Sequence, residues 1–361
     1  MRKSWHVVGY CVTVAITLVI ADMSWLHGVE ARWRAYDKVG YQKNVLMVSA
    51  PQLQFAGPAA HDPTMAYDGK QYYLYTTGPG IPASRSKDLR EWEPVPKVFP
   101  SPQQWGMDFD ATWNGNVWAP NIARYHDKWL MFYAISRFGK NESAIGLAIS
   151  KSLDPSSRNY HWDDHGIVVQ THRGDNWNAI DPNFTIDANG SPFLAAGSFW
   201  SGIKLFKLDS KSLKPLDAEH PIALASRPNT PEIQGSIEAP FLQYRGGWYY
   251  LFASYDFCCR GANSTYNVRV GRSRSILGPF VDLSGKRMLE GGGTQILFPD
   301  ERWKGPGHCC ICRNAAGVDQ IVYHAYDAQN NGLPRLQVRE LNWGADGWPS
   351  VQTPNQTSNS L

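Results

Sequence analysis

The sequence predicts an all-β fold, a five-bladed β-propeller, and three observations support that prediction. Five short motifs recur at nearly constant spacing, and an aromatic-rich run of strand-forming residues follows each of them. No long stretch beyond the N-terminal segment has helical periodicity. A fixed period is typical of repeat architectures, and five units of three or four strands fit a ring of blades around a channel.

The first element of each repeat is a motif with one polar position. These positions are Asp62, Asn121, Asp181, Glu238 and His308, at steps of 59, 60, 57 and 70 residues. The motifs are His61-Asp62-Pro63, Trp118-Ala119-Pro120-Asn121, Ala179-Ile180-Asp181-Pro182, Ile237-Glu238-Ala239-Pro240 and Gly305-Pro306-Gly307-His308. Equivalent positions of repeats that close into a ring converge on one point, so we expect these side chains to face the channel.

The next elements are strands. Each motif is followed by a turn rich in Gly, Asn or Asp and then by an apolar run, which is typical of a buried hairpin strand. The runs are Tyr72–Thr77, Trp129–Ser136, Phe193–Phe199, Trp248–Asp256 and Gln320–Asp327. A further segment follows each run, at 83–86, 145–148, 203–206, 268–271 and 336–339. A β-sandwich with coincidental spacing is the alternative architecture.

The N-terminal segment is typical of an export signal. Arg2 and Lys3 precede an apolar stretch at 7–21, and Val29-Glu30-Ala31 offers small residues for cleavage. We predict a signal peptide at 1–31 and a single propeller domain at 32–361, and therefore a secreted or periplasmic protein without stable membrane association after cleavage. An uncleaved anchor is the alternative, because residues 22–28 form a long spacer.

Charge and aromatic content narrow the class of partner. The formal net charge is +3, which gives no reason to expect nucleic acid or an anionic lipid surface. We expect a monomer. The chain has 15 Trp and 17 Tyr, most of which we expect to pack between blades, while others can stack on sugar rings.

The cysteines allow several interpretations. Removal of Cys11 with the signal leaves an odd number, namely Cys258, Cys259, Cys309, Cys310 and Cys312. The spacing of Cys309 and Cys312 beside His308 raises the hypothesis of a zinc site. Strand alternation would turn Cys309 away from Cys310 and Cys312, and there is no second C-x-x-C. One or two disulfides, or inert buried thiols, are favoured, with connectivity left open.

Three of the five polar positions are carboxylic acids. If Asp62, Asp181 and Glu238 crowd one partly dry pocket, like charges raise the pKa of at least one of them. A neutral acid beside an ionised base is what glycoside hydrolysis requires. One Asp-Pro alone is typical of a turn or strand start, but three carboxyl groups in register are not.

The motifs resemble those of glycoside hydrolase family 43, and of its endo-arabinanases in particular. The resemblance covers roughly His61 to Pro349. Longer stretches that carry it are Ser136–Leu147, Gly197–Lys204, Asp256–Gly261, Asn263–Tyr266, Leu289–Thr294 and Tyr323–Asp327. It implies a five-bladed propeller that cleaves α-1,5-linked L-arabinofuranose chains, in arabinan or arabino-oligosaccharides, with inversion.

The resemblance also implies roles for residues. Asp62 would be the general base, Glu238 the general acid, and Asp181 the residue that tunes the pKa of Glu238 and holds it in place. Inversion would need the Asp62 and Glu238 carboxyl groups about 6.5–9.5 Å apart. The implied substrate contacts are Asp62, Gly139, Asn178, Ala179, Ile180, Asp181, Ser198, Phe199 and Trp200.

A metal contact is implied at His308, which resembles the histidine that faces a metal, usually calcium, in these channels. Calcium prefers oxygen ligands, so a single histidine implies a mostly water-filled shell. A hydrogen-bonded core histidine is the alternative. Two positions depart from the family: Asn121 stands where Asp is common, and cysteines follow His308 where small or polar residues are expected. Cys258-Cys259 matches the family.

Other functions remain open on sequence alone. An exo-acting arabinanase, α-L-arabinofuranosidase or β-xylosidase would use the same blades with different loops at the channel mouth. A non-catalytic sugar-binding propeller would not need all three carboxyl groups. A fructan-cleaving enzyme is suggested by Asp181-Pro182-Asn183, but such enzymes carry that motif in the first blade and here it lies in the third.

Overall fold

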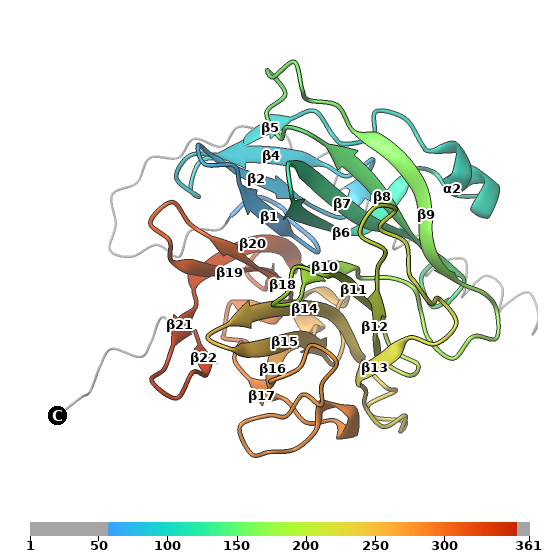
Figure 1. Ribbon diagram of the computed structural model, residues 1–361. Coiled ribbons are helices and arrows are strands. Elements are labelled where there is room, and N and C mark those ends of the chain that lie inside the picture. The colour runs from blue at the N-terminus through green and yellow to red at the C-terminus, as the bar shows by residue number, and fades with distance from the viewer. Residues whose placement is uncertain (1–56, 352–361) are drawn as a thin grey trace, which may run out of the picture. The chain divides into compact units, whose positions relative to one another are not determined.

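Residues 57–351, which are described by a computed structural model, form five antiparallel sheets around a common centre (Figure 1). The sheets follow one another around the ring in chain order, so the predicted five-bladed propeller is confirmed. The predicted signal peptide at 1–31, and the start of the predicted domain at 32, lie outside the described residues.

The blades are built from consecutive strands. Blade one has β1 (Thr64–Tyr67), β2 (Tyr72–Tyr75), β4 (Ala83–Ser86) and β5 (Glu93–Val95). Blade two has β3 (Gly78–Pro79), β6 (Asn116–Tyr125), β7 (Lys128–Ile135), β8 (Ser143–Ser150) and β9 (Asp163–Thr171). Blade three has β10 (Asn183–Ile186), β11 (Pro192–Ala196), β12 (Ile203–Lys207) and β13 (Ile222–Ala225).

Blade four has β14 (Ile237–Arg245), β15 (Trp248–Tyr255), β16 (Asn267–Ser273) and β17 (Thr294–Gln295), and blade five has β18 (Trp303–Arg313), β19 (Asp319–Asp327) and β20 (Leu333–Glu340). A two-stranded sheet of β21 (Asn342–Trp343) and β22 (Pro349–Ser350) follows. The helical segments are α2 (Gln104–Phe109) and the 3₁₀ turns η1 (Gly261–Asn263) and η2 (Met288–Glu290). Within 57–351 no helix has the length and apolar character needed to cross a membrane.

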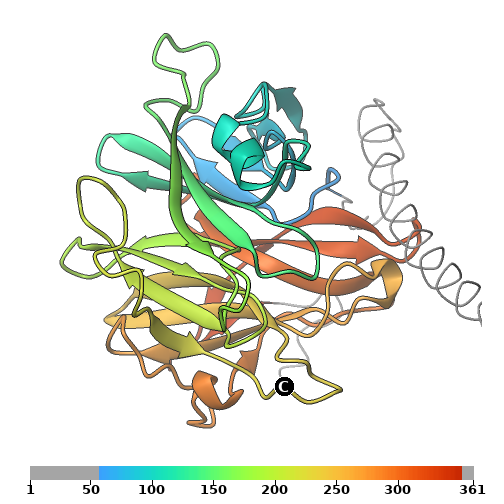
Figure 2. The same ribbon diagram turned by 90° about the vertical axis from the view of Figure 1, so that its right-hand side faces the viewer.

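The ring is closed by the segment that precedes β1. Ala60 N–H donates to the Pro334 carbonyl at 3.2 Å, and Leu336 N–H donates to the Pro58 carbonyl at 2.9 Å. A Cβ on Gly57 would lie 2.5 Å from the Leu336 carbonyl oxygen, so only glycine permits this approach. Residues 58–60 therefore pair with β20 and join the first blade to the last, which lie side by side in Figures 1 and 2.

Each predicted motif has a left-handed residue within an inner strand or just before it. One non-glycine residue per motif has a left-handed backbone: Asp62 (φ 48°), Ala119 (φ 44°), Asp181 (φ 57°), Ala239 (φ 52°) and His308 (φ 50°). In the first four a proline follows, and proline is tolerated at bulges because it has no N–H to donate to the ladder. The register shifts at this point in β6, β14 and β18. Such a bulge re-aims the side chains beside it.

The bulges correct the expected position of Asn121. Counted from the left-handed residue of its blade, Asn121 is equivalent to Thr64 and Asn183, and its counterpart of Asp62 is Ala119. Asn121 Oδ1 accepts the Phe184 N–H of blade three at 2.9 Å, and Asn183 Oδ1 makes the same bond to blade four at 2.8 Å. Asn121 thus ties neighbouring blades together and is not a channel residue that has lost its charge.

Apolar side chains fill the space between every pair of neighbouring blades, as expected from the aromatic content. Phe132 of blade two stacks on Phe184 of blade three with ring centroids 5.7 Å apart. Equivalent clusters join blades one and two, three and four, four and five, and five and one. Each large side chain buried there contributes about 1.5–3 kcal/mol, so the ring is stabilised at its blade interfaces.

The zinc hypothesis for the C-x-x-C motif is wrong. Cys309 packs between blades four and five, whereas Cys310 and Cys312 pack between blades five and one. All three are buried free thiols, and burial raises the pKa of Cys310 and of Cys312 to about 12. Cys258 and Cys259 form a disulfide with each other.

The role of Asn121 predicts a loss of stability in Asn121→Ala. The change leaves the buried Phe184 N–H without its acceptor, which costs about 1–3 kcal/mol of unfolding free energy. Denaturant unfolding measures this cost, and Asn189→Ala in an exposed turn is the matched control. Equal stabilities of the two variants would contradict the inter-blade role.

Candidate active site

The candidate active site lies where the left-handed segments of blades one, three, four and five meet. Asp181 is 7% exposed and Glu238 is 8% exposed, and the Asp62 side chain is 13% exposed. The charges of Asp62, Asp181, Glu238 and His308 each affect the pKa of others in the set. The structure therefore brings together the four residues that the sequence predicted to converge.

Asp62 is held as a carboxylate. Its Oδ1 lies 3.1 Å from His308 Nδ1, and its Oδ2 accepts the Thr77 hydroxyl at 2.7 Å and lies 2.9 Å from His61 Nδ1. Burial raises the pKa of Asp62, but the two imidazoles outweigh burial and hold the pKa well below its usual value. Burial conversely lowers the pKa of His308, but Asp62 reverses this and raises it to about 9.

His324 fixes the backbone of Asp62. Its Nδ1 accepts the Asp62 N–H at 3.1 Å, so its proton is on Nε2, which is buried and has no hydrogen-bond partner among the described residues. Burial, with His61 nearby, holds the pKa of His324 well below its usual value. A neutral imidazole thus supports the left-handed conformation of Asp62.

Glu238 has the opposite environment. Ser198 Oγ donates to its Oε2 and the Tyr266 hydroxyl donates to its Oε1, both at 2.6 Å. Burial raises the pKa of Glu238; the two hydroxyl groups lower it, and the charge of Asp62 raises it further. The net shift is upward, which favours a protonated carboxyl group.

Asp181 supports Glu238 through the backbone. Its Oδ2 accepts the N–H of Ala239, the next residue after Glu238, at 3.0 Å. Burial and the charges of Glu238 and Asp62 raise the pKa of Asp181 well above its usual value, although His308 opposes them. Asp181 therefore crosses from blade three to blade four and fixes the strand that carries Glu238.

The remaining predicted substrate contacts divide into two groups. Asn178, Ala179 and Ile180 are buried, and their polar groups are used within the protein: Asn178 Oδ1 accepts the Ser143 hydroxyl, Ala179 N–H donates to Thr171, and the Ile180 carbonyl accepts Gly197 N–H. Gly139 and Trp200 are exposed, the latter by 41%, and Phe199 is half-buried.

No role for Tyr266, Thr77, His61 or His324 followed from the sequence motifs. Tyr266 and His324 belong to stretches that resemble the family, yet no role followed from that resemblance. His324 had one usable signal, because it is a histidine inside an otherwise apolar strand. Tyr266 and Thr77 have no such signal, since their roles depend on contacts between different blades.

A calcium site was predicted at His308, and the donor set there is small. His308 Nδ1 faces Asp62, so only Nε2 remains for a cation. The metal-capable groups of three or more side chains found in residues 57–351 are His61 with Cys258 and Cys259, and His61 with Asp62 and His324. Neither includes His308, so further ligands of a cation on His308 would have to be water.

A five-bladed ring with two buried carboxyl groups at its centre, one with a lowered and one with a raised pKa, fits a glycoside hydrolase of the propeller type. Comparison with known proteins agrees: the sequence pattern described as Glycosyl hydrolases family 43 matches residues 57–349. The chain belongs to this family, and it is a glycoside hydrolase.

Two relatives show how activities vary within the family. The chain is 44% identical to an extracellular endo-α-(1→5)-L-arabinanase of Bacillus subtilis, over 80% of this chain and 87% of the relative. It is 40% identical to an extracellular exo-α-(1→5)-L-arabinofuranosidase of Cellvibrio japonicus, over 81% of this chain and 86% of the relative.

Solved structures show the same variation. An exo-1,5-α-L-arabinanase from a bovine ruminal metagenomic library superimposes with a TM-score of 0.79 at 41% identity, over 84% of this chain and 100% of that one. The native arabinanase of Bacillus subtilis gives a TM-score of 0.74 at 43% identity, over 82% and 98% of the two chains.

The contact between Tyr266 and Glu238 predicts a shift in the pH profile of Tyr266→Phe. This hydroxyl lowers the pKa of Glu238 by donating a hydrogen bond to its carboxylate, so its removal raises that pKa. If Glu238 must be protonated, the alkaline limb of kcat/KM moves to higher pH. Tyr244→Phe, at an exposed tyrosine, is the control; a limb that stays in place or moves to lower pH would contradict the prediction.

Proposed function

We propose that the protein is an exported endo-α-1,5-L-arabinanase that hydrolyses arabinan with inversion. The observation that carries the proposal is the opposite pKa shift of two carboxyl groups in one buried cluster, downward for Asp62 and upward for Glu238. The extracellular endo-acting Bacillus subtilis relative supports both the substrate and the export.

Asp62 acts as the general base in this proposal. As a carboxylate it accepts a proton from a water molecule, which attacks the anomeric carbon from the face opposite the leaving group. Thr77 and His308 fix its two oxygens by contacts of 2.7 and 3.1 Å, so the carboxylate is oriented before substrate arrives.

Glu238 acts as the general acid. It gives its proton to the glycosidic oxygen as the bond breaks, and the Ser198 and Tyr266 hydroxyl groups then stabilise the carboxylate that remains. Asp181 holds the Glu238 strand through Ala239. Base and acid thus come from blades one and four, on separate walls of one channel.

The acid role predicts that Glu238→Gln loses about 10²–10⁴-fold in kcat on arabinan. An aryl arabinofuranoside with a good leaving group needs less protonation and should lose much less. In the wild type, activity falls as pH rises through the raised pKa of Glu238, and this alkaline limb should be absent in the variant. A variant as fast as wild type on arabinan would refute the assignment.

Endo action predicts a mixture of oligosaccharides early in the hydrolysis of debranched arabinan, measured by chromatography of a time course. The same early samples, analysed by NMR, should contain the β-anomer at the new reducing end, because inversion of an α-linkage gives β. A single small product throughout would instead support exo action, which the Cellvibrio japonicus relative makes the second candidate. An initial α-anomer would exclude inversion.

We also propose that calcium binds His308 through Nε2, and that it displaces the proton which the raised pKa of His308 keeps on that atom without a metal. A metal-bound histidine commonly donates its other ring N–H to a carboxylate, and Asp62 lies 3.1 Å from Nδ1. Bound calcium would add positive charge to the channel.

Calcium binding at His308 predicts a rise in melting temperature with calcium relative to a chelator. The stabilisation is about 2.7 kcal/mol at about 100 times the dissociation constant, and His308→Gln should not show it. Magnesium, which demands octahedral geometry, is the control ion. An equal response of wild type and variant would place the ion elsewhere.

A further inference from the structure

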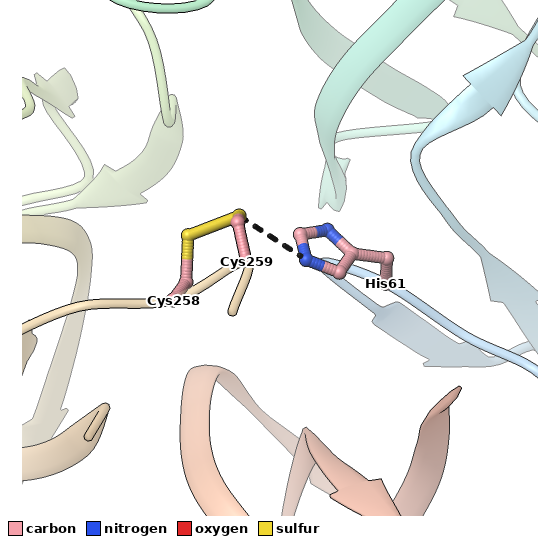
Figure 3. Close-up of side chains that lie close together, drawn as sticks. All are labelled: His61, Cys258 and Cys259. Atoms are coloured by element: carbon pink, nitrogen blue, oxygen red, sulfur yellow. Dashed lines mark hydrogen bonds between the residues drawn. A yellow bond between two sulfur atoms is a disulfide. The ribbon is translucent and has the colours of Figure 1, made fainter. Parts of the chain in front are cut away.

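The Cys258–Cys259 disulfide lies against the residue that precedes the proposed base. Cys259 is exposed, and its Sγ lies 3.7 Å from Nε2 of the buried His61 (Figure 3). The two cysteines belong to the loop between β15 and η1 in blade four, whereas His61 precedes β1 in blade one. The disulfide therefore lies within a surface loop and contacts a buried residue at the centre of the ring.

A continuous series of contacts leads from this loop to Asp62. The Cys259 N–H donates to the Tyr326 hydroxyl at 2.8 Å, and that hydroxyl lies 3.0 Å from His61 Nε2. His61 Nδ1 lies 2.9 Å from Asp62 Oδ2. One assignment of protons is consistent with all three distances: Tyr326 accepts from Cys259 and donates to Nε2, which leaves the proton of His61 on Nδ1, 2.9 Å from Asp62 Oδ2.

The disulfide holds the Cys259 N–H, the first donor of this series, in place. A bond between adjacent cysteines closes a small ring that includes their shared peptide bond, so it restricts the backbone of Cys259. Cys259 has φ 64°, a left-handed conformation that non-glycine residues adopt uncommonly. Without the ring, the backbone of Cys259 is free to leave this conformation, and its N–H then turns away from Tyr326.

The same loop also reaches the proposed acid. The Phe257 carbonyl accepts the N–H groups of Thr265 at 2.9 Å and Tyr266 at 3.1 Å, which closes the base of the loop. Tyr266 then donates to Glu238. The hydrogen bond from Tyr266 to Glu238 is thus anchored at the base of the loop and does not require Cys259. Loss of the disulfide should therefore affect mainly Asp62.

We propose that the Cys258–Cys259 disulfide is a positioning element for the base, and that Tyr326 and His61 are positioning residues that transmit its constraint to Asp62. The proposal rests on the proposed function, in which Asp62 activates water. It predicts that loss of the disulfide lowers kcat while the KM for a short arabino-oligosaccharide changes little, because Tyr326 and His61 are buried and act on the reaction through the base.

The test is reduction of the folded enzyme by a water-soluble phosphine. The S–S bond breaks, each sulfur becomes a thiol with a proton from water, and the phosphine gains the oxygen and becomes the phosphine oxide. Cys309, Cys310 and Cys312 are already thiols and do not react. We expect kcat to fall about 10-fold to 100-fold, the effect of a misplaced catalytic group, with KM within about twofold.

Two variants complete the test. The double variant Cys258→Ala/Cys259→Ala should reproduce the reduced enzyme and should not respond to phosphine. Tyr326→Phe removes the central hydroxyl and should lower kcat by a similar factor with the disulfide intact. Reoxidation of the reduced wild type should restore kcat, and its melting curve shows whether the fold is retained.

The possible results distinguish failure of the positioning role from failure of the proposed function. Unchanged kcat after reduction, or a rise in KM alone, would overturn the positioning role. A lower melting temperature with unchanged kcat would also overturn it, since the disulfide would then only stabilise the loop. If Asp62→Asn is inactive while the reduced enzyme keeps its kcat, only this inference fails; if Asp62→Asn keeps wild-type turnover, the proposed function fails with it.

Discussion

The burial of ionisable groups at the centre of the ring is the constraint on which the rest of this structure depends. Each carboxyl group there has lost most of its contact with water, so its proton state is set by its few protein neighbours. Asp62 faces His308, His61 and a hydroxyl group, and stays ionised. Glu238 faces hydroxyl groups and a negative charge, and its pKa rises. Two similar acids thus acquire different chemistry from their surroundings.

A repeated left-handed backbone conformation is what brings these groups together. Every blade has one residue with a left-handed backbone at the equivalent position, but the side chains at and beside that position have different roles. Asp62, Asp181 and His308 occupy the left-handed position itself, and Glu238 precedes it. In blade two the position is Ala119, which brings no charge, and the polar Asn121 two residues later serves the packing of blades.

The sequence was sufficient for the architecture and for the members of the central cluster. The period and the aromatic runs predicted five blades, and the polar motifs predicted that Asp62, Asp181, Glu238 and His308 converge. Spacing could not reveal the role of Asn121, because a count of polar residues does not locate the bulge. Strand alternation did separate Cys309 from Cys310 and Cys312. The contacts of Tyr266, His324 and Cys259 join residues of different blades, so their distances follow only from the closed ring.

The most direct test of the central claim is the proton state of the two carboxyl groups at neutral pH. Carbon-13 NMR of enzyme labelled at the side-chain carboxyls of Asp and Glu reports it, with Asp62→Asn and Glu238→Gln used to assign the two resonances. The structure predicts that Asp62 shows the shift of a carboxylate down to low pH, and that Glu238 titrates at a higher pH than an ordinary glutamate. Similar titration of both groups near their ordinary values, or the reverse order, would contradict the account.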